Sequence, residues 1–304
     1  MSNLAAEAAT KKLVSRIVGG LGNQLFCYAA ARRLSLVNGM DLVLDDTSGF
    51  SRDFSHRRVY QLDHFHIQCR RASAAERLEP LARVRRYVKR RVNHWLPFQS
   101  RAFIQQEGFD FDARLLDVRP QGNLHLEGYW QSEAYFSDVA DVIRNDLRIR
   151  APGDSANQQL AMRIRDGASV ALHMRFFDPP AGGGINNAPG DYYTRAIARM
   201  EMLAPDAHYF VFSDQPGAVR GRIALPDHRL TVVSHNTGDA MAYADLWLMT
   251  LCRHFIIANS TFSWWGAWLA GQPAKKIIAP GFEMRQGKMW WGFKGLLPDD
   301  WIRL

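Results

Sequence analysis

The chain has 304 residues, of which 47% are hydrophobic, 12% aromatic and 22% charged. This composition excludes an intrinsically disordered chain and leaves room for two domains of about 150 residues each. The formal net charge of +8 is compatible with a nucleic acid or an anionic surface as partner, so its position along the chain decides what it means.

Most of this net charge lies in one segment. Residues 70–91 contain nine Arg and Lys residues against two Glu, a net +7, whereas the other 282 residues together carry +1. A nearly neutral protein with one basic segment is a poor match for a nucleic-acid-binding protein. We expect a basic amphipathic helix within residues 70–96, either solvated with its arginines on the exposed face or docked on anionic lipid.

The cysteines and the apolar segments indicate the compartment. Cys27, Cys69 and Cys252 lie far apart and match neither a disulfide framework nor a zinc site. The first ten residues lack the apolar run of a signal peptide, and the apolar stretch 255–270 is interrupted by polar residues. We therefore expect a cytoplasmic protein, soluble or peripheral at the cytoplasmic face of the membrane.

The first half of the chain alternates short apolar runs with helical patterns. Strands are predicted at 14–18, 42–44 and 124–129, and helices at 23–37, 77–96 and 137–147. The stretch 148–157 contains Pro152 and Gly153 and is predicted to be a linker. The first domain is accordingly placed at residues 1–150.

The second half repeats the alternation and is expected to form a domain at residues 151–304. Strands are predicted at 169–175, 208–212, 230–233, 254–258 and 277–279, and helices at 191–203, 239–251 and 262–270. Such alternation indicates an α/β fold with parallel sheets. Two Rossmann-type domains would then face each other across a cleft that holds the active site.

A glycine-rich turn, GGLGNQ at residues 19–24, stands between the first strand and the first helix. Glycines there let backbone N–H groups approach an anion at the helix N-terminus, which makes Gly20, Gly22, Asn23 and Gln24 candidates for ligand binding. The run is no dinucleotide fingerprint, because Leu25 stands at the position of the third glycine. A plain tight turn is the alternative.

Two strand ends carry further candidates. His173 and Arg175 alternate onto one face of the predicted strand 169–175, and strand carboxyl ends in α/β sheets open into the ligand crevice. Arg175 offers a permanent forked cation for phosphate, unless it merely pairs with Asp178. Asp214, after the strand 208–212, can accept hydrogen bonds from a base or sugar, or simply initiate the turn that follows it.

The most specific pattern is NSTFSWWG at residues 259–266, after a predicted helix that carries Asp245. Asn259 or Ser260 can cap the helix that begins near Phe262. Its free N–H groups and hydroxyls would cradle a diphosphate. The alternative is an ordinary helix cap followed by tryptophans in the core.

Metal binding and the general base are less well indicated. Asp110 and Asp112 form a DxD pattern, which we interpret as a helix start rather than a metal site. Glu127, Asp46 and His173 are candidate bases for a proton transfer, and no spacing selects one of them.

Together these motifs resemble the α-1,2-fucosyltransferases of glycosyltransferase family 11. The resemblance runs from about residue 14 to 291 and rests on the motifs GGLGNQ, His-x-Arg-x-x-Asp at 173–178, FSD at 212–214, GYWQSEAYF at 128–136 and the long block at 245–270 that contains NSTFSWW. It implies a GT-B-like fold and an inverting transfer from GDP-β-L-fucose to a glycan acceptor, with no metal and no other cofactor. The donor would lie in the C-terminal half and the acceptor, which a membrane lipid can carry, on the N-terminal side.

The resemblance also implies residue roles. Arg175 would hold the diphosphate, and His173 and Asp178 would organise the nucleotide pocket. The donor contacts would be completed by Gly20, Gly22, Asn23, Gln24, Asp214, Asn259, Ser260, Thr261, Phe262 and Ser263. The family motif reads His-x-Arg-Arg-x-Asp, whereas Phe176 stands at its second Arg. A different nucleotide-sugar donor and a non-catalytic sugar-nucleotide binder therefore remain as alternatives.

Overall fold

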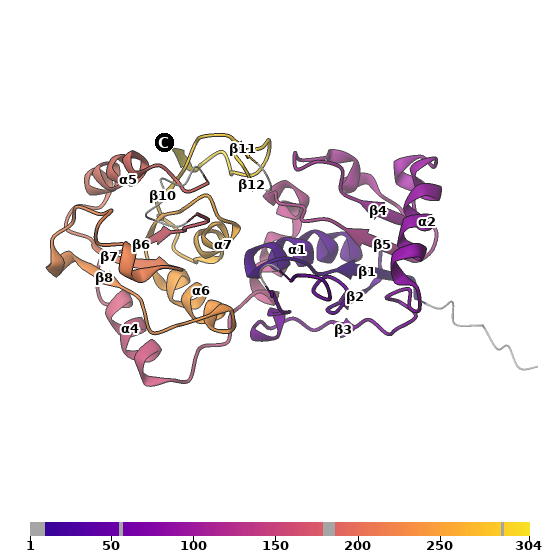
Figure 1. Ribbon diagram of the computed structural model, residues 1–304, viewed down its shortest axis with the longest axis horizontal. Helices are drawn as coiled ribbons and strands as arrows, with labels where there is room; N and C mark the ends of the chain where they lie inside the picture. Colours follow the sequence, from indigo (N-terminus) through magenta and orange to yellow (C-terminus); the bar gives the residue numbers. More distant parts are fainter. Residues whose placement is uncertain (1–9, 55–56, 179–185, 287–288) are drawn as a thin grey trace, which may run out of the picture.

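The computed structural model describes residues 10–54, 57–178, 186–286 and 289–304. Figure 1 shows two lobes side by side, one from the first half of the chain and one from the second half, each built around its own β-sheet. None of the helices in these ranges is both long and apolar enough to cross a lipid bilayer.

The first lobe contains a five-stranded parallel sheet with the order β3-β2-β1-β5-β4. Its strands and helices, in chain order, are β1 (Lys12–Arg16), α1 (Leu21–Val37), β2 (Asp41–Asp45), β3 (Arg70–Arg71), α2 (Ala82–His94), β4 (Phe103–Gln105), β5 (Leu124–Glu127) and α3 (Ala140–Asp146). Central β1 is fully buried over Leu13–Ser15, as both faces of a parallel sheet are covered.

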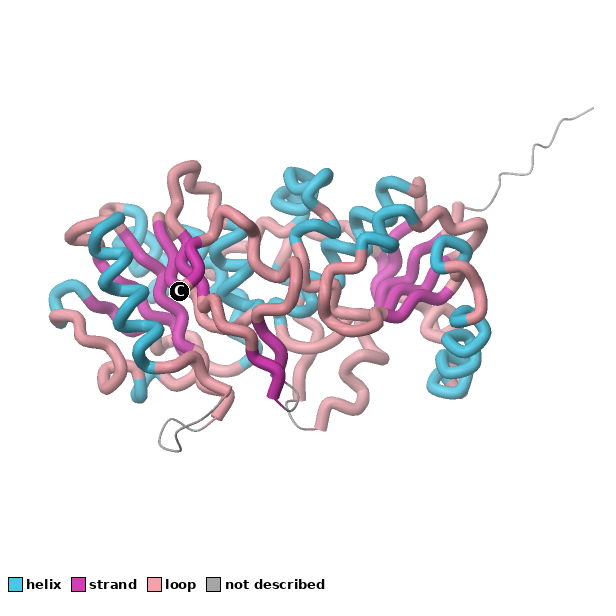
Figure 2. The backbone as a smooth tube through the Cα atoms, turned by 90° about the horizontal axis from the view of Figure 1, so that it is seen from above, coloured by secondary structure: helices cyan, strands magenta, loops and turns pink. Residues whose placement is uncertain are grey.

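The second lobe contains a six-stranded parallel sheet with the order β13-β10-β9-β6-β7-β8. Its elements are α4 (Ser155–Arg165), β6 (Ser169–Met174), α5 (Gly190–Leu203), β7 (His208–Ser213), β8 (Leu230–Val232), α6 (Ala242–Leu251), β9 (His254–Ile256), α7 (Thr261–Leu269), β10 (Ile277–Ala279) and β13 (Ile302–Arg303). An antiparallel pair, β11 (Met284–Gln286) and β12 (Met289–Trp291), precedes the last strand. In Figure 2 the strands of the five-stranded sheet are clearly apart from those of the six-stranded sheet.

The lobes join through an aromatic core between α1 and α7. The ring of Phe26 lies 4.6 Å from Trp264 and 4.8 Å from Trp265, centroid to centroid. The ring of Phe136 stacks on Trp265 at 5.6 Å. Trp264 and Trp265 of the NSTFSWWG motif therefore pack in the core. This agrees with the alternative interpretation of the motif, in which a helix cap is followed by core tryptophans.

The structure extends the predicted elements and corrects some of their ends. It adds the short strands β3, β4 and β13, whose two or three residues give no readable pattern, and it adds α4 at the end of the predicted linker, where the Asp154 side chain caps the helix. The strand predicted to reach residue 129 ends at Glu127, because Gly128 has a φ of 152° and Trp130 a φ of 56°.

The basic helix differs most from the expectation. A helix at 77–96 was predicted, but α2 covers only Ala82–His94. Arg70 pairs with Glu76, and Arg77 pairs with Glu79, before the helix begins. α2 lies on the far side of the first lobe from the second lobe (Figure 1).

Candidate functional site

A cavity of about 530 Å³ lies where the second sheet meets the first lobe. It is lined by the carboxyl ends of β6 and β7, by the loop before α6 and by the N-terminal residues of α1 and α7. After β6 the chain adds β7 and β8 on one side of β6. It then crosses over and adds β9, β10 and β13 on the other side. This reversal of strand order next to β6 is where open α/β sheets bind their ligands.

His173 lies on the cavity wall at the end of β6 and is only 4% exposed. Its Nδ1 is 2.9 Å from the Ser263 hydroxyl. Burial, with the nearby Arg175 cation, lowers the pKa of His173 to about 3. The imidazole is therefore neutral at physiological pH and acts as a hydrogen-bonding group there rather than as a cation.

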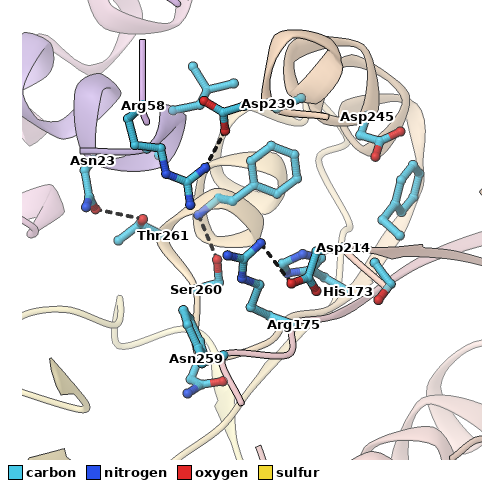
Figure 3. Close-up of a pocket in the computed structure, with 18 of the residues that line it drawn as sticks. Asn23, Arg58, His173, Arg175, Asp214, Asp239, Asp245, Asn259, Ser260 and Thr261 are labelled. Carbon is cyan, nitrogen blue, oxygen red and sulfur yellow. Dashed lines mark hydrogen bonds and ion pairs between the residues drawn. The ribbon is translucent and has the colours of Figure 1, made fainter. Parts of the chain in front are cut away.

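Arg175 also faces the cavity and pairs with Asp214 from the next strand at 3.2 Å. Arg175 therefore forms its ion pair with Asp214, which follows the neighbouring strand β7, and not with Asp178 as the sequence alternative had it. Asp214 is held in addition by the backbone N–H of Phe176, at 3.0 Å. Figure 3 shows Arg175 and Asp214 side by side, with His173 behind them.

A second cation, Arg58, reaches the same cavity from the first lobe and was not singled out in the sequence. Its guanidinium pairs with Asp239 of the second lobe. The Gln61 amide also donates to Asp239, at 2.7 Å. Arg58 and Arg175 thus approach the cavity from different lobes, each beside one carboxylate of the second lobe (Figure 3).

The α7 N-terminus forms another wall. Ser260 is the N-cap, and its hydroxyl accepts a hydrogen bond from the N–H of Phe262 at 3.3 Å. The preceding Asn259 is 2% exposed and donates to the Asn186 carbonyl at 3.1 Å. Within the described ranges no donor reaches the Asn259 Oδ1 atom, although it is buried. A ligand N–H or O–H would satisfy this oxygen.

The glycine-rich turn brings the α1 N-terminus against the α7 N-terminus. A Cβ atom on Gly22 would lie 2.5 Å from the Thr261 carbonyl carbon and 2.6 Å from the Phe262 nitrogen. The Asn23 Oδ1 atom accepts from the Thr261 hydroxyl at 2.9 Å and from the Gln131 amide at 2.8 Å. Gly22 and Asn23 line the cavity, but their contacts chiefly fix one lobe on the other.

Asp245 on α6 faces another part of the cavity and was noted in the sequence without a role. It is half-buried, and the Asn236 amide donates to it at 2.8 Å. Burial raises the pKa of Asp245 to about 7, while the hydrogen bond from Asn236 acts in the opposite direction. Asn236 is itself held by the Asn157 side chain.

Ten of the predicted site residues line this cavity: Gly20, Gly22, Asn23, His173, Arg175, Asp214, Asn259, Ser260, Thr261 and Phe262. Three others do not. Gln24 is buried and holds the loop that carries Arg58, through the Val59 carbonyl and the Gln61 N–H. Ser263 is buried behind His173.

Asp178 is the third, because it is not among the residues that line this cavity. Its carboxylate accepts hydrogen bonds from the backbone N–H and side-chain amide of Asn186, which lower its pKa. It therefore holds Asn186, which lines the adjoining larger cavity. Phe176, at the second Arg of the family motif, is 6% exposed and packs in the core of the second lobe rather than on the cavity wall.

A larger cavity, of about 1750 Å³, adjoins the first on the side of the first lobe. The two cavities share the lining residues Gly20, Asn23, Arg58, Tyr129, Arg175 and Phe177. Arg58 and Arg175 therefore stand at the junction. Asp53 lines the larger cavity, and its carboxylate accepts from the backbone N–H of Arg58 at 3.0 Å.

Two of the three candidate bases lie elsewhere. Glu127 is buried in ion pairs with Arg86 at 2.9 Å and Arg16 at 3.9 Å, and Asp46 pairs with Arg71 at 3.6 Å. Neither lines either cavity, whereas the third candidate, His173, does.

The DxD pattern is used structurally. Asp112 caps the 3₁₀ turn Ala113–Asp117, as a helix start predicts, and Asp110 accepts from the Lys294 N–H. Among the described residues, no three His, Cys, Asp or Glu side chains are grouped so that they could hold a metal ion.

The chain belongs to glycosyl transferase family 11, whose family model matches residues 14–288. It is 27% identical to the O-antigen biosynthesis glycosyltransferase WbnK of Escherichia coli, over 96% of this chain and all of that protein. It is 26% identical to an α-1,2-colitosyltransferase of the same organism, over 96% of this chain and 98% of the relative.

Solved structures share the fold. The α-1,6-fucosyltransferase NodZ, soaked with GDP-fucose, superposes with a TM-score of 0.53 at 15% identity, over 86% of this chain and 93% of that one. A second NodZ structure, from Bradyrhizobium, gives a TM-score of 0.51 at 14% identity, over 86% and 92%. The predicted GT-B-like α/β fold, the family and the glycosyltransferase class are thereby confirmed.

Proposed function

We propose that this member of glycosyl transferase family 11 transfers L-fucose from GDP-β-L-fucose to a glycan hydroxyl with inversion, forming an α-1,2 linkage. The observation that carries the proposal is the junction of the two cavities, where Arg58 and Arg175 stand between a nucleotide-sized space and a larger open one. A donor whose diphosphate lies at this junction would place its sugar towards the larger cavity, where the acceptor enters.

The smaller cavity has groups suited to a guanine nucleotide. Guanine presents two adjacent donors, its N1–H and its 2-amino group, and a carboxylate can accept from both. Asp245, oriented by Asn236, is such a carboxylate. The buried Asn259 oxygen offers one more acceptor to the donor.

Bond cleavage releases GDP, so negative charge grows on the β-phosphate as the bond from the sugar's anomeric carbon to the phosphate oxygen breaks. Arg175, Arg58 and the N–H groups at the α7 N-terminus would stabilise this charge. These fixed charges are what we propose in place of a divalent metal ion, with no other cofactor.

Inversion requires that the acceptor oxygen attack from the face opposite the leaving GDP while a base takes its proton. We propose Asp53 for this role, because its carboxylate lines the larger cavity beside Arg58. His173 is instead proposed to hold the donor, because it is buried on the opposite side of the junction.

The relative that is named an α-1,2-colitosyltransferase makes colitose a second candidate sugar. Colitose is fucose without its 3-hydroxyl group, so the same diphosphate site would serve both donors. Because Phe176 is buried in the core, the missing second Arg of the motif gives little support for a different sugar. A non-catalytic nucleotide binder would leave the acceptor cavity without a role.

The acceptor is proposed to be a glycan, carried on a membrane lipid at the cytoplasmic face. The relative named for O-antigen biosynthesis supports a glycan acceptor. No nucleic-acid partner is proposed, since the net charge outside residues 70–91 is only +1.

A donor panel tests the proposal. Thermal shift with GDP, UDP and ADP, with and without EDTA, should show stabilisation by GDP that EDTA does not remove. Transfer or hydrolysis of GDP-fucose, GDP-colitose, GDP-mannose and UDP-sugars, followed by mass spectrometry, should select GDP-fucose. No response to GDP, or a requirement for metal, would contradict the proposed mechanism.

A further inference from the structure

Helix α2 packs on the first lobe through its polar side. The Arg86 side chain is only 12% exposed and forms ion pairs of 2.9 Å with both Asp45 and Glu127. Further along the same helix, the Asn93 Oδ1 atom accepts from the backbone N–H groups of Ala102 and Phe103, at 2.7 and 3.0 Å. The core of the lobe therefore receives the charged and amide groups of this helix.

The apolar side of α2 faces outwards instead. Val84, Val88 and Val92, spaced four residues apart, are each at least half exposed, and Trp95 at the end of the helix is 85% exposed. Apolar residues with this spacing form one continuous stripe along a helix. Such a stripe in water is unusual in a soluble protein and marks an interaction surface.

Cations border the stripe. From Pro80 to Leu96 the chain has six Arg and Lys residues and no Asp or Glu. On a helical projection, Arg91 lies along one edge of the stripe and Arg85 along the other, and both are exposed. An apolar stripe between two basic edges matches a helix that lies in the headgroup region of an anionic bilayer.

The stripe also leads to the proposed acceptor cavity. Leu81, Val84 and Tyr87 line the same cavity as Arg175. A surface that met the membrane at α2 would therefore place the open side of the cavity at the bilayer, where a lipid-linked acceptor resides.

We propose that α2 docks on an anionic bilayer, with its apolar stripe among the lipid headgroups and its arginines on lipid phosphates, and delivers a lipid-linked acceptor to the adjacent cavity. The identity of the acceptor rests on the proposed function, whereas the docking itself does not. A protein partner or a second copy of the chain is the competing occupant. The bilayer is favoured because the stripe is edged by cations on both sides and ends in an exposed tryptophan, as membrane-interface helices do.

Vesicle co-sedimentation tests the docking. The full chain is mixed with vesicles of phosphatidylcholine and phosphatidylglycerol at 7:3, or of phosphatidylcholine alone. Binding to the anionic vesicles should be at least about tenfold stronger and should weaken as salt is raised.

Two variants separate the contributions. Val88→Asp with Val92→Asp places charge on the stripe, and Arg85→Gln with Arg91→Gln removes the basic edges; each should reduce vesicle binding about tenfold or more. The matched controls are Met162→Asp with Met202→Asp, at exposed apolar positions of the second lobe, and Arg195→Gln with Arg220→Gln, at exposed arginines elsewhere. Both controls should bind vesicles as the wild type does.

The readouts distinguish this inference from the proposed function. The α2 variants should keep wild-type GDP binding and GDP-fucose turnover on a short soluble acceptor, while losing turnover on the same acceptor attached to vesicle lipid. Equal binding to neutral and anionic vesicles, unchanged binding by the variants, or a dimer that Val88→Asp dissociates would overturn the docking. If the wild-type protein does not bind GDP at all, that result would instead contradict the proposed function.

Discussion

Replacing Asp245 by asparagine should stabilise the free protein and at the same time weaken guanine-nucleotide binding. Burial raises the pKa of this carboxyl from its ordinary value of 3.8 to about 7 in the folded state. Between pH 3.8 and about pH 7, Asp245 keeps its proton in the folded protein, whereas the same carboxyl has lost it in the unfolded chain. The free energy of unfolding therefore falls as the pH rises through this window, and this contribution is constant above about pH 7.

The magnitude follows from the two pKa values. One pKa unit corresponds to about 1.4 kcal/mol, so keeping Asp245 ionised costs the folded protein at most about 4 kcal/mol at pH 8. Part of this cost is relieved by water, because one side of the carboxylate faces the cavity. Asparagine has nearly the same shape, carries no charge and can still accept from Asn236.

We therefore expect urea denaturation to show Asp245→Asn more stable than the wild type at pH 8, by about 1–4 kcal/mol, and the difference to shrink at pH 4. In calorimetry at pH 8 the variant should bind GDP at least about tenfold more weakly, since the loss of one charged hydrogen bond costs roughly 1.5–3 kcal/mol. It should also discriminate less between GDP and UDP. Asp141→Asn, at a fully exposed carboxylate, is the control and should change neither property.

Wild-type stability of Asp245→Asn at both pH values would refute a raised pKa of Asp245. A stability gain of the variant over the wild type that is smaller at pH 8 than at pH 4 would refute it as well. Unchanged affinity for GDP would leave the carboxylate as a buried charge with no part in nucleotide recognition. Rising GDP affinity of the wild type between pH 6 and pH 8 would independently support a carboxylate that must ionise to bind.

Three further predictions concern the junction and the contact between the lobes. Arg175→Ala should lower kcat for transfer by at least about 10³-fold while leaving the urea midpoint unchanged, and substantial turnover would refute its role at the leaving group. Asp53→Asn should lower kcat by about 10²-fold or more with unchanged GDP affinity; a normal kcat would exclude Asp53 as the base. Gly22→Ala should lower the free energy of unfolding by about 1–3 kcal/mol, because its Cβ would meet the Thr261 backbone at 2.5 Å, whereas Gly167→Ala, in open space, should not.

The sequence predicted the parts of the site that lie within one motif. His173 and Arg175 follow from their alternation at the end of a buried strand, and Ser260 follows from cap chemistry. Arg58 and Asp239 could not be found in this way, since they are 181 positions apart and meet only when the lobes are packed together. Asp245 had one signal, a carboxylate on an otherwise apolar helix, but nothing in the spacing placed that helix at the cavity.

The helix α2 shows a different limit of sequence patterns. Its amphipathic spacing was predicted correctly, yet the pattern alone does not say which face meets the protein. The ion pairs of Arg86 with Asp45 and Glu127 decide this, and both partners belong to strands distant in the sequence. Patterning thus predicted a helix with two faces, and tertiary contacts turned its apolar face towards solvent.

The arrangement of charges at the junction ties donor binding to the contact between the lobes. Arg58 belongs to the first lobe, and its carboxylate partner Asp239 belongs to the second, so this ion pair exists only while the lobes are together. Gln24, at the start of α1, fixes the loop that carries Arg58, and Gly22 and Asn23 fix the same turn against α7. The glycine-rich motif therefore fixes the distance between the two lobes, each of which supplies one of the two cations, and in the proposed function it would serve the donor diphosphate through these cations.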